Sequence, residues 1–118
     1  MQTFEIFHNE PDVRTLPAGQ VIFTEGQPSN GLMYAVLDGE VIITRNQQTL
    51  ETVGPGGVFG EMALLDQQAR SGTAMARTDC RVAAITEQRF TRLVTQNPLF
   101  ALGMMRLLAE RVRHNLTS

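Results

Sequence analysis

The sequence predicts a mainly β protein, an antiparallel sandwich or barrel with helices at its ends. Short apolar segments recur at close spacing between about residues 13 and 87, and turn residues separate them. Many short strands at this spacing favour a sandwich or barrel over a parallel sheet, whose strands need long crossovers. After residue 87 the apolar residues follow helical spacing instead.

Each expected strand is bounded by a turn signal. Asp38-Gly39 separates two apolar runs and is a strong hairpin signal, because both residues tolerate positive φ. Gln47-Gln48 indicates a second, weaker hairpin, and Thr78-Asp79 is expected to join the last strand pair. Strands are expected over 21–24, 32–37, 40–44, 73–77 and 80–85.

Helices are expected at both ends of the chain. A short one is expected over 3–9, and another over 87–95. Asn97 suits an N-cap and Pro98 a first helical position, so a long helix is predicted from Pro98 to about Leu116. One apolar stripe of this helix consists of Leu102, Met105, Ala109, Val112 and Leu116, and a second face carries Phe100, Met104, Leu107 and Leu108. One face would pack on the barrel and the other on a partner, because 3-4-3-4 spacing is also the coiled-coil pattern.

Composition restricts the function classes. The 118 residues predict a single domain, with the barrel over about 13–86 and helices over about 87–117. The net charge of −2 argues against direct nucleic-acid binding by this chain. One cysteine and no signal peptide fit a cytoplasmic protein, and no apolar run is long enough for a membrane segment.

Residues 60–73, GEMALLDQQARSGT, combine groups that suit two ends of one ligand. Residues 61–65 predict a single helical turn, whose unpaired N–H groups favour an anion. Arg70 supplies the forked donors that match phosphate, and Ser71 and Gly72 permit close approach of the backbone. Glu61 repels phosphate but accepts from a hydroxyl. A ribose phosphate carries both groups.

The same residues resemble the phosphate-binding cassette of the cyclic-nucleotide-binding domain, the family of the catabolite activator protein and the regulatory subunit of protein kinase A. The cassette match is FGEMAL at 59–64 and RSGTAMA at 70–76. Residues 16–27 resemble the family's entry strands and 34–41 its central hairpin. The resemblance covers about 13–116. It implies an antiparallel β-roll or jelly-roll barrel (a double-stranded β-helix) with a short cassette helix and a long C-terminal helix.

The resemblance also implies roles for individual residues. Glu61 would accept from the ribose 2′-hydroxyl, and Arg70 would pair with the cyclic phosphate. The backbone of Gly60 and Ala63 and the backbone and hydroxyl of Ser71 would complete the cradle. The expected ligand-binding set is Gly60, Glu61, Met62, Ala63, Arg70, Ser71 and Gly72; candidate base contacts are Val58, Met75, Arg111 and Arg113. Gly72 departs from the family, which usually has alanine there.

The resemblance therefore predicts a regulatory sensor module that binds cyclic AMP and signals through its C-terminal helices. Ser71 follows the catabolite activator pattern and favours cyclic AMP, while its hydroxyl leaves cyclic GMP open. No cofactor is expected. The partner would be a second copy bound through the 98–116 helix, an output domain or another protein. The alternative is a ligand-free or altered-ligand domain of the same fold that acts as a protein-interaction module.

Other site types fit the residues less well. Residues 54–60 lack the spacing of a dinucleotide fingerprint. His8 and His114 lie near opposite ends of the chain and read as solvated surface residues rather than metal ligands. Cys80 has no paired base and reads as a buried apolar group. No catalytic constellation is found, so an enzyme is not expected.

Overall fold

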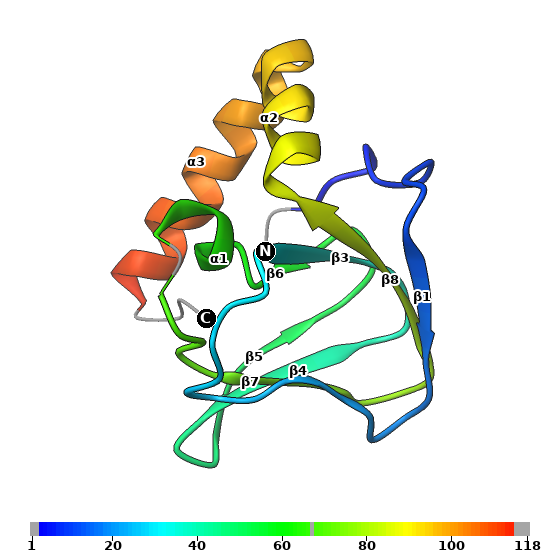
Figure 1. Cartoon of the computed structure of the whole chain (residues 1–118), viewed down its shortest axis with the longest axis vertical. Helices are drawn as coiled ribbons and strands as arrows, with labels where there is room; N and C mark the ends of the chain where they lie inside the picture. The colour runs from blue at the N-terminus through cyan, green and yellow to red at the C-terminus, as the bar shows by residue number, and fades with distance from the viewer. Residues whose placement is uncertain (1–2, 67, 115–118) are drawn as a thin grey trace.

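The computed structural model describes residues 3–66 and 68–114. Eight strands and three helices follow one another in these residues, and the helices lie on one side of the strands (Figure 1). The strands are β1 Val13–Leu16, β2 Val21–Phe23, β3 Leu32–Asp38, β4 Val41–Arg45, β5 Gln48–Val53, β6 Val58–Phe59, β7 Thr73–Ala76 and β8 Cys80–Thr86. The helices are α1 Met62–Leu65, α2 Glu87–Gln96 and α3 Pro98–Arg113.

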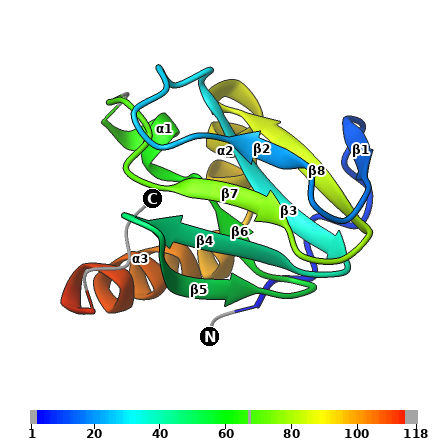
Figure 2. The same cartoon turned by 90° about the horizontal axis from the view of Figure 1, so that it is seen from below.

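The strands form two antiparallel four-stranded sheets that face each other (Figure 2). Their orders are β1-β8-β3-β6 and β2-β7-β4-β5. Consecutive strands thus often lie in different sheets. This arrangement is the antiparallel β-roll that the family resemblance implied. The members of each sheet come from distant parts of the chain.

Two of the expected hairpins are wrong in detail. β3 and β4, on either side of Asp38-Gly39, lie in different sheets, as do β7 and β8 around Thr78-Asp79. Gly39 is nevertheless required, because its φ is +81° and a Cβ there would lie 2.6 Å from the Cys80 Cβ. The turn is a corner between sheets, and the weaker signal at Gln47 marks the real hairpin, where β4 pairs with β5.

Two apolar clusters cover the two faces of the first sheet. One lies between the sheets and includes Tyr34, Phe59 and Ile43. The other lies between the first sheet and the helices and includes Met33, Phe100 and Leu107. Both faces of β3 and β8 are therefore buried, which explains why these two strands are the most continuously apolar.

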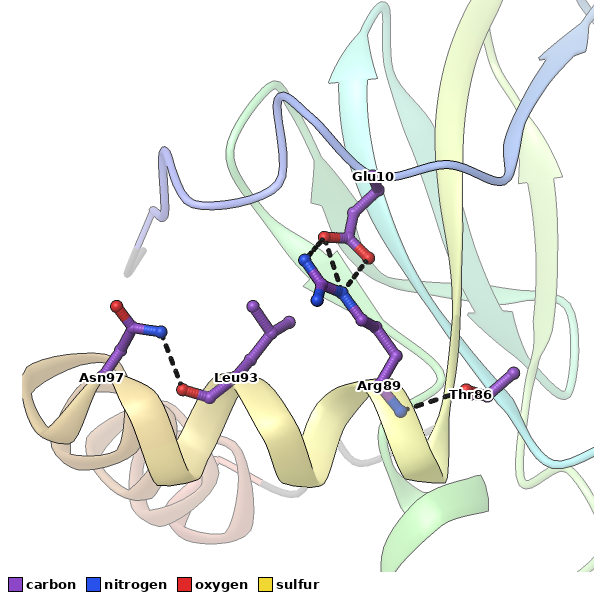
Figure 3. Close-up of polar contacts among 5 residues, drawn as sticks. All are labelled: Glu10, Thr86, Arg89, Leu93 and Asn97. Atoms are coloured by element: carbon purple, nitrogen blue, oxygen red, sulfur yellow. Dashed lines mark hydrogen bonds and ion pairs between the residues drawn. The ribbon is translucent and has the colours of Figure 1, made fainter.

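Helices α2 and α3 lie where the sequence predicted them, with differences at their ends. Thr86 is the N-cap of α2 and its hydroxyl accepts from the Arg89 N–H at 3.1 Å. Asn97 does not cap α3 with its side chain, because its amide donates to the Leu93 carbonyl at 2.9 Å. The residues expected to form an N-terminal helix form turns instead. They pass over α2, where the buried Glu10 binds Arg89 with both oxygens at 2.8–3.1 Å (Figure 3).

The face of α3 that packs on the roll is the second of the two expected faces. Phe100, Met104 and Leu107 are buried, whereas Leu102 and Met105 on the first stripe are exposed. Leu116 lies outside the described residues. The α3 stripe is therefore free of the parent barrel within the described part of the chain.

Candidate functional site

The loop from β6 into α1 brings Glu61 into the interior. Gly60 has a φ of +73°, and a Cβ there would lie 3.0 Å from an Arg70 nitrogen and 3.1 Å from the Phe23 ring. Glycine at this position therefore permits both the sharp turn and the close approach of Arg70. The turn leaves Glu61 only 1% exposed.

Helix α1 is too short to form the anion site that the sequence analysis expected at its N-terminus. It has four residues, and the Ala63 N–H is already bonded to the Gly60 carbonyl at 3.2 Å. A helix dipole of one turn contributes little, so the attraction of this region for an anion rests on Arg70.

Arg70 is a buried cation that has no counter-ion among residues 3–66 and 68–114. It is 4% exposed and stacks over the Phe23 ring at 4.0 Å. Its guanidinium donates to the Gly60 carbonyl at 3.1 Å and to Asn30 Oδ1 and the Leu32 carbonyl at 2.8 Å. No carboxylate of the described residues forms an ion pair with it. Burial lowers the pKa of Arg70, and the nearby Glu61 charge opposes this shift without cancelling it.

Arg111, from the C-terminal half of α3, supplies the counter-ion of Glu61. Its Nη1 donates to Glu61 Oε1 at 2.9 Å, and its Nη2 donates to Glu51 Oε2 at 2.7 Å and the Val58 carbonyl at 2.6 Å. Arg111 is 2% exposed. Burial alone would lower the pKa of Arg111, but the charges of Glu61 and Glu51 raise it above the ordinary value. This is the opposite direction from Arg70.

Glu61, Arg111 and Glu51 form a buried charged cluster. Two buried polar atoms of this cluster have no hydrogen-bond partner in the described structure. They are Glu61 Oε2 and Arg111 Nε. One is a charged acceptor and the other is a donor. Buried polar groups are nearly always satisfied, so such atoms in an interior site are the natural contacts of a ligand that carries hydroxyl, amine or ring-nitrogen groups.

Glu51 is the residue of this cluster that the sequence analysis missed. It lies on β5 opposite Ile43, and Val53, two residues later, lies opposite Val41. Ile43, Val41 and Val53 all belong to the cluster between the sheets, so Glu51 is on the same inward face. The sequence carries no clear signal for this, because the burial of Gln48–Val53 does not alternate and the neighbouring Leu50 also packs on that cluster.

The other predicted site residues lie at varied depths. The Val58 side chain is buried in the helix-facing cluster, so only its carbonyl reaches the site. Met75 is on the opposite face of β7 from the inward-facing Ala74 and Ala76. Met62 is half-buried, and Ser71 and Arg113 are exposed. Contacts of Met75 and Arg113 with a base stay predictions.

Close packing explains why glycine, rather than the family's usual alanine, stands at position 72. A Cβ at this position would lie 2.8 Å from the Thr44 carbonyl of β4. The end of the cassette therefore packs directly on the neighbouring strand. Alongside it, Arg45 Nε donates to the Ser71 carbonyl at 2.9 Å. An alanine here would push the cassette away from β4.

A surface pocket of about 270 Å³ opens beside the cassette. Ser29, Asn30, Gly31 and Ala63 line it. Asn30 also accepts from Arg70, so the pocket adjoins the buried cation. No cluster able to hold a metal ion occurs among residues 3–66 and 68–114, and none of the helices described there has the length and hydropathy to span a membrane.

The comparisons with known proteins agree with this geometry. Residues 13–97 match the model of the cyclic nucleotide-binding domain. The cyclic AMP receptor protein of Thermus thermophilus is 37% identical over 105 residues, which cover 85% of this chain and 48% of that protein. The cAMP-dependent protein kinase regulatory subunit of Aspergillus niger is 34% identical over 85 residues, covering 70% of this chain and 20% of that protein.

A solved structure gives the same result. The crystal structure of the Thermus thermophilus catabolite activator protein matches with a TM-score of 0.79 at 32% identity, covering 93% of this chain and 59% of that one. The matched part of this chain spans less than half the length of each of the two relatives named in the preceding paragraph. The fold, the cassette and the family match lead to one conclusion: the chain belongs to the cyclic nucleotide-binding domain family.

Proposed function

We propose that this chain binds cyclic AMP and acts as a regulatory sensor domain rather than an enzyme. The observation that carries the proposal is the buried Arg70 guanidinium, whose hydrogen bonds within the described part of the chain all go to neutral acceptors. A buried cation without an anion is costly, and a phosphate would complete it. The names of two relatives, a cyclic AMP receptor protein and a cAMP-dependent kinase subunit, support cyclic AMP.

The proposed roles follow the positions of the groups. Arg70 binds the cyclic phosphate, and the exposed Ser71 contributes its backbone and hydroxyl. The unpartnered Glu61 Oε2 accepts from the ribose 2′-hydroxyl, while Arg111 keeps the other oxygen. Cyclic GMP is the second candidate ligand, because the Ser71 hydroxyl also suits it.

The proposed output runs through the C-terminal helices. Arg111 belongs to α3 and contacts Glu61, so a ligand at Glu61 acts directly on the position of α3. The exposed Leu102, Met105 and Val112 give α3 a face for a second copy, an output domain or another protein. A cytoplasmic location, expected from the single cysteine, is part of the same proposal.

One observation favours the alternative, a domain of this fold that binds no nucleotide. Glu61 already has a cationic partner in Arg111. In that case the cluster would be purely structural, and the domain would act through protein contacts alone.

Titration calorimetry with cyclic AMP and cyclic GMP separates the two functions. We expect binding of at least one nucleotide. Removing one member of a desolvated charge pair costs about 2–5 kcal/mol, so Arg70→Leu should weaken binding about 30-fold or more. The control is Arg81→Leu, because Arg81 forms a surface pair with Asp38 away from the cassette. Absence of heat with both nucleotides would leave only the interaction module.

A second variant assigns the ribose contact. Glu61→Gln should weaken cyclic AMP more than its 2′-deoxy form, because the deoxy form lacks the hydroxyl that the carboxylate accepts. An equal loss for both nucleotides would remove Glu61 from the ribose while leaving the phosphate assignment of Arg70 in place.

A further inference from the structure

The ring of Phe23 faces the buried cation of the cassette from inside the roll. Phe23 is 3% exposed, and the guanidinium carbon of Arg70 lies 4.0 Å from its ring centroid. Phe23 ends β2, which lies alongside β7 (Figure 2). A bulge between Val21 and Phe23 shifts the register of β2 against β7, so that Phe23 lies opposite Ala74. Bulges re-aim side chains next to binding sites, and this one accompanies the ring that underlies Arg70.

Two other aromatic rings hold Phe23 in place. The ring centroids of Tyr34 and Phe59 lie 6.2 Å and 6.1 Å from that of Phe23, and these two rings stack on each other at 5.3 Å. All three rings belong to the cluster between the sheets. A Cβ at Gly60 would lie 3.1 Å from the Phe23 ring and 3.0 Å from Arg70 Nη1. The ring, the guanidinium and the cassette backbone therefore pack as one unit.

The turn that follows Phe23 fixes the main chain of Arg70. The Gly26 N–H donates to the Arg70 carbonyl at 2.7 Å, and the Arg70 N–H donates to the Gln27 carbonyl at 2.9 Å. One short segment of the chain thus holds both the backbone and the guanidinium of this arginine. Within the described residues, Nε and one N–H of Nη1 of Arg70 form no hydrogen bond, so these donors are left for a ligand.

Arg70 has an alternative partner close by in Glu61. Glu61 Oε2 is buried without a hydrogen bond, and the Glu61 charge attracts Arg70. A direct pair of the two side chains would neutralise the cation, but none forms within the described residues, where the guanidinium lies over the face of Phe23 instead. The π electrons of a ring stabilise a cation. Unlike a carboxylate, the ring adds no full negative charge that would repel a phosphate.

We propose that Phe23 is a positioning residue for the phosphate of the bound nucleotide, which rests on the proposed function. Its ring fixes the plane of the Arg70 guanidinium and keeps the cation apart from Glu61. The unused N–H groups of Arg70 therefore stay available to the phosphate. Phe23 acts through Arg70 and not on the nucleotide itself.

Fluorinated phenylalanine at position 23 tests the role of the ring face. Fluorine atoms draw electron density from the face with little change in ring size, and so weaken its attraction for a cation. Replacement of Phe23 by mono-, di- and trifluorophenylalanine should weaken cyclic AMP binding progressively in calorimetry, by about tenfold in total. The same series at Phe7, a ring 1% exposed in the helix-facing cluster, should leave the affinity unchanged. Absence of a trend at position 23 would overturn the proposal.

A double-mutant cycle with Arg70 separates positioning from core packing. Phe23→Leu should weaken cyclic AMP binding about tenfold in the otherwise unchanged chain, but should have little further effect beside Arg70→Leu, because the ring acts through the guanidinium. Equal losses in both backgrounds would make Phe23 a packing residue only. Phe7→Leu, the control for loss of a buried ring, should lower the melting temperature without that loss of affinity. If the unsubstituted chain binds no nucleotide, the proposed function itself fails, an outcome distinct from a missing fluorine trend.

Discussion

Replacing Arg111 by methionine tests whether the buried cluster exists in solution. Methionine keeps much of the apolar stem, so the main loss is the guanidinium that serves Glu61, Glu51 and the Val58 carbonyl. Glu61 and Arg111 are 1% and 2% exposed, which places the broken pair in the range of about 3–5 kcal/mol for a buried pair that loses one partner. For a domain of this size the melting temperature should fall by roughly 10–20 °C.

Urea denaturation of the ligand-free chain gives the free energy of unfolding for this comparison. The double variant Arg111→Met with Glu61→Gln should lose less than the sum of the two single variants, by at least about 1 kcal/mol, because the second substitution removes the stranded charge. A loss below about 1 kcal/mol in Arg111→Met, or simple additivity in the double variant, would show that the two side chains are not paired in solution.

Three further predictions concern stability. In urea denaturation, Gly39→Ala should lower the free energy of unfolding by at least about 2 kcal/mol, because φ is +81° and the added Cβ would meet Cys80. The control Gly19→Ala, at φ +90° with open space around it, should lower it by about 1 kcal/mol. Similar losses in the two variants would refute the packing argument. Burial, with a smaller effect of Asp79, raises the pKa of the Cys80 thiol above its ordinary value. The unfolded thiol ionises first, so this stabilisation is fully present below the ordinary thiol pKa and is lost as pH rises through the folded pKa. In urea denaturation at alkaline pH, Cys80→Ala should lack that part of the decline. Phe100→Ala, which removes ring contacts with Phe4, Phe7 and Phe90, should lower the melting temperature through a loss of about 3–5 kcal/mol, and an unchanged melting temperature would exclude that packing.

The sequence predicted local elements better than their pairing. Strand and helix positions depend on spacing and turn residues, which are local, and α2 and α3 begin at the expected Glu87 and Pro98. Pairing depends on which sheet each strand joins. Asp38-Gly39 has the composition of a hairpin, but the demand for glycine comes from Cys80, which is far along the chain. No local pattern carries that information.

The candidate site divides in the same way. That Glu61 and Arg70 lie in one region was predictable, because both belong to one short segment with a recognisable order of residues. The ion pair of Glu61 with Arg111 joins residues fifty positions apart and was not predicted, although Arg111 had been singled out for another role. Glu51 was missed because a single carboxylate on a strand is normally solvated, and only the register of β5 with β4 shows that it points inward.

If the proposed function holds, the Arg111 side chain makes nucleotide binding and the placement of α3 thermodynamically reciprocal. One guanidinium belongs to the helix and touches the carboxylate proposed for the ribose, with no intervening residue. If nucleotide changes the affinity of α3 for a partner by some factor, that partner must change the affinity for nucleotide by the same factor. Under the proposed function, a partner bound to α3 would therefore set the nucleotide concentration at which the domain responds, and different partners on this helix would tune the domain to different nucleotide levels.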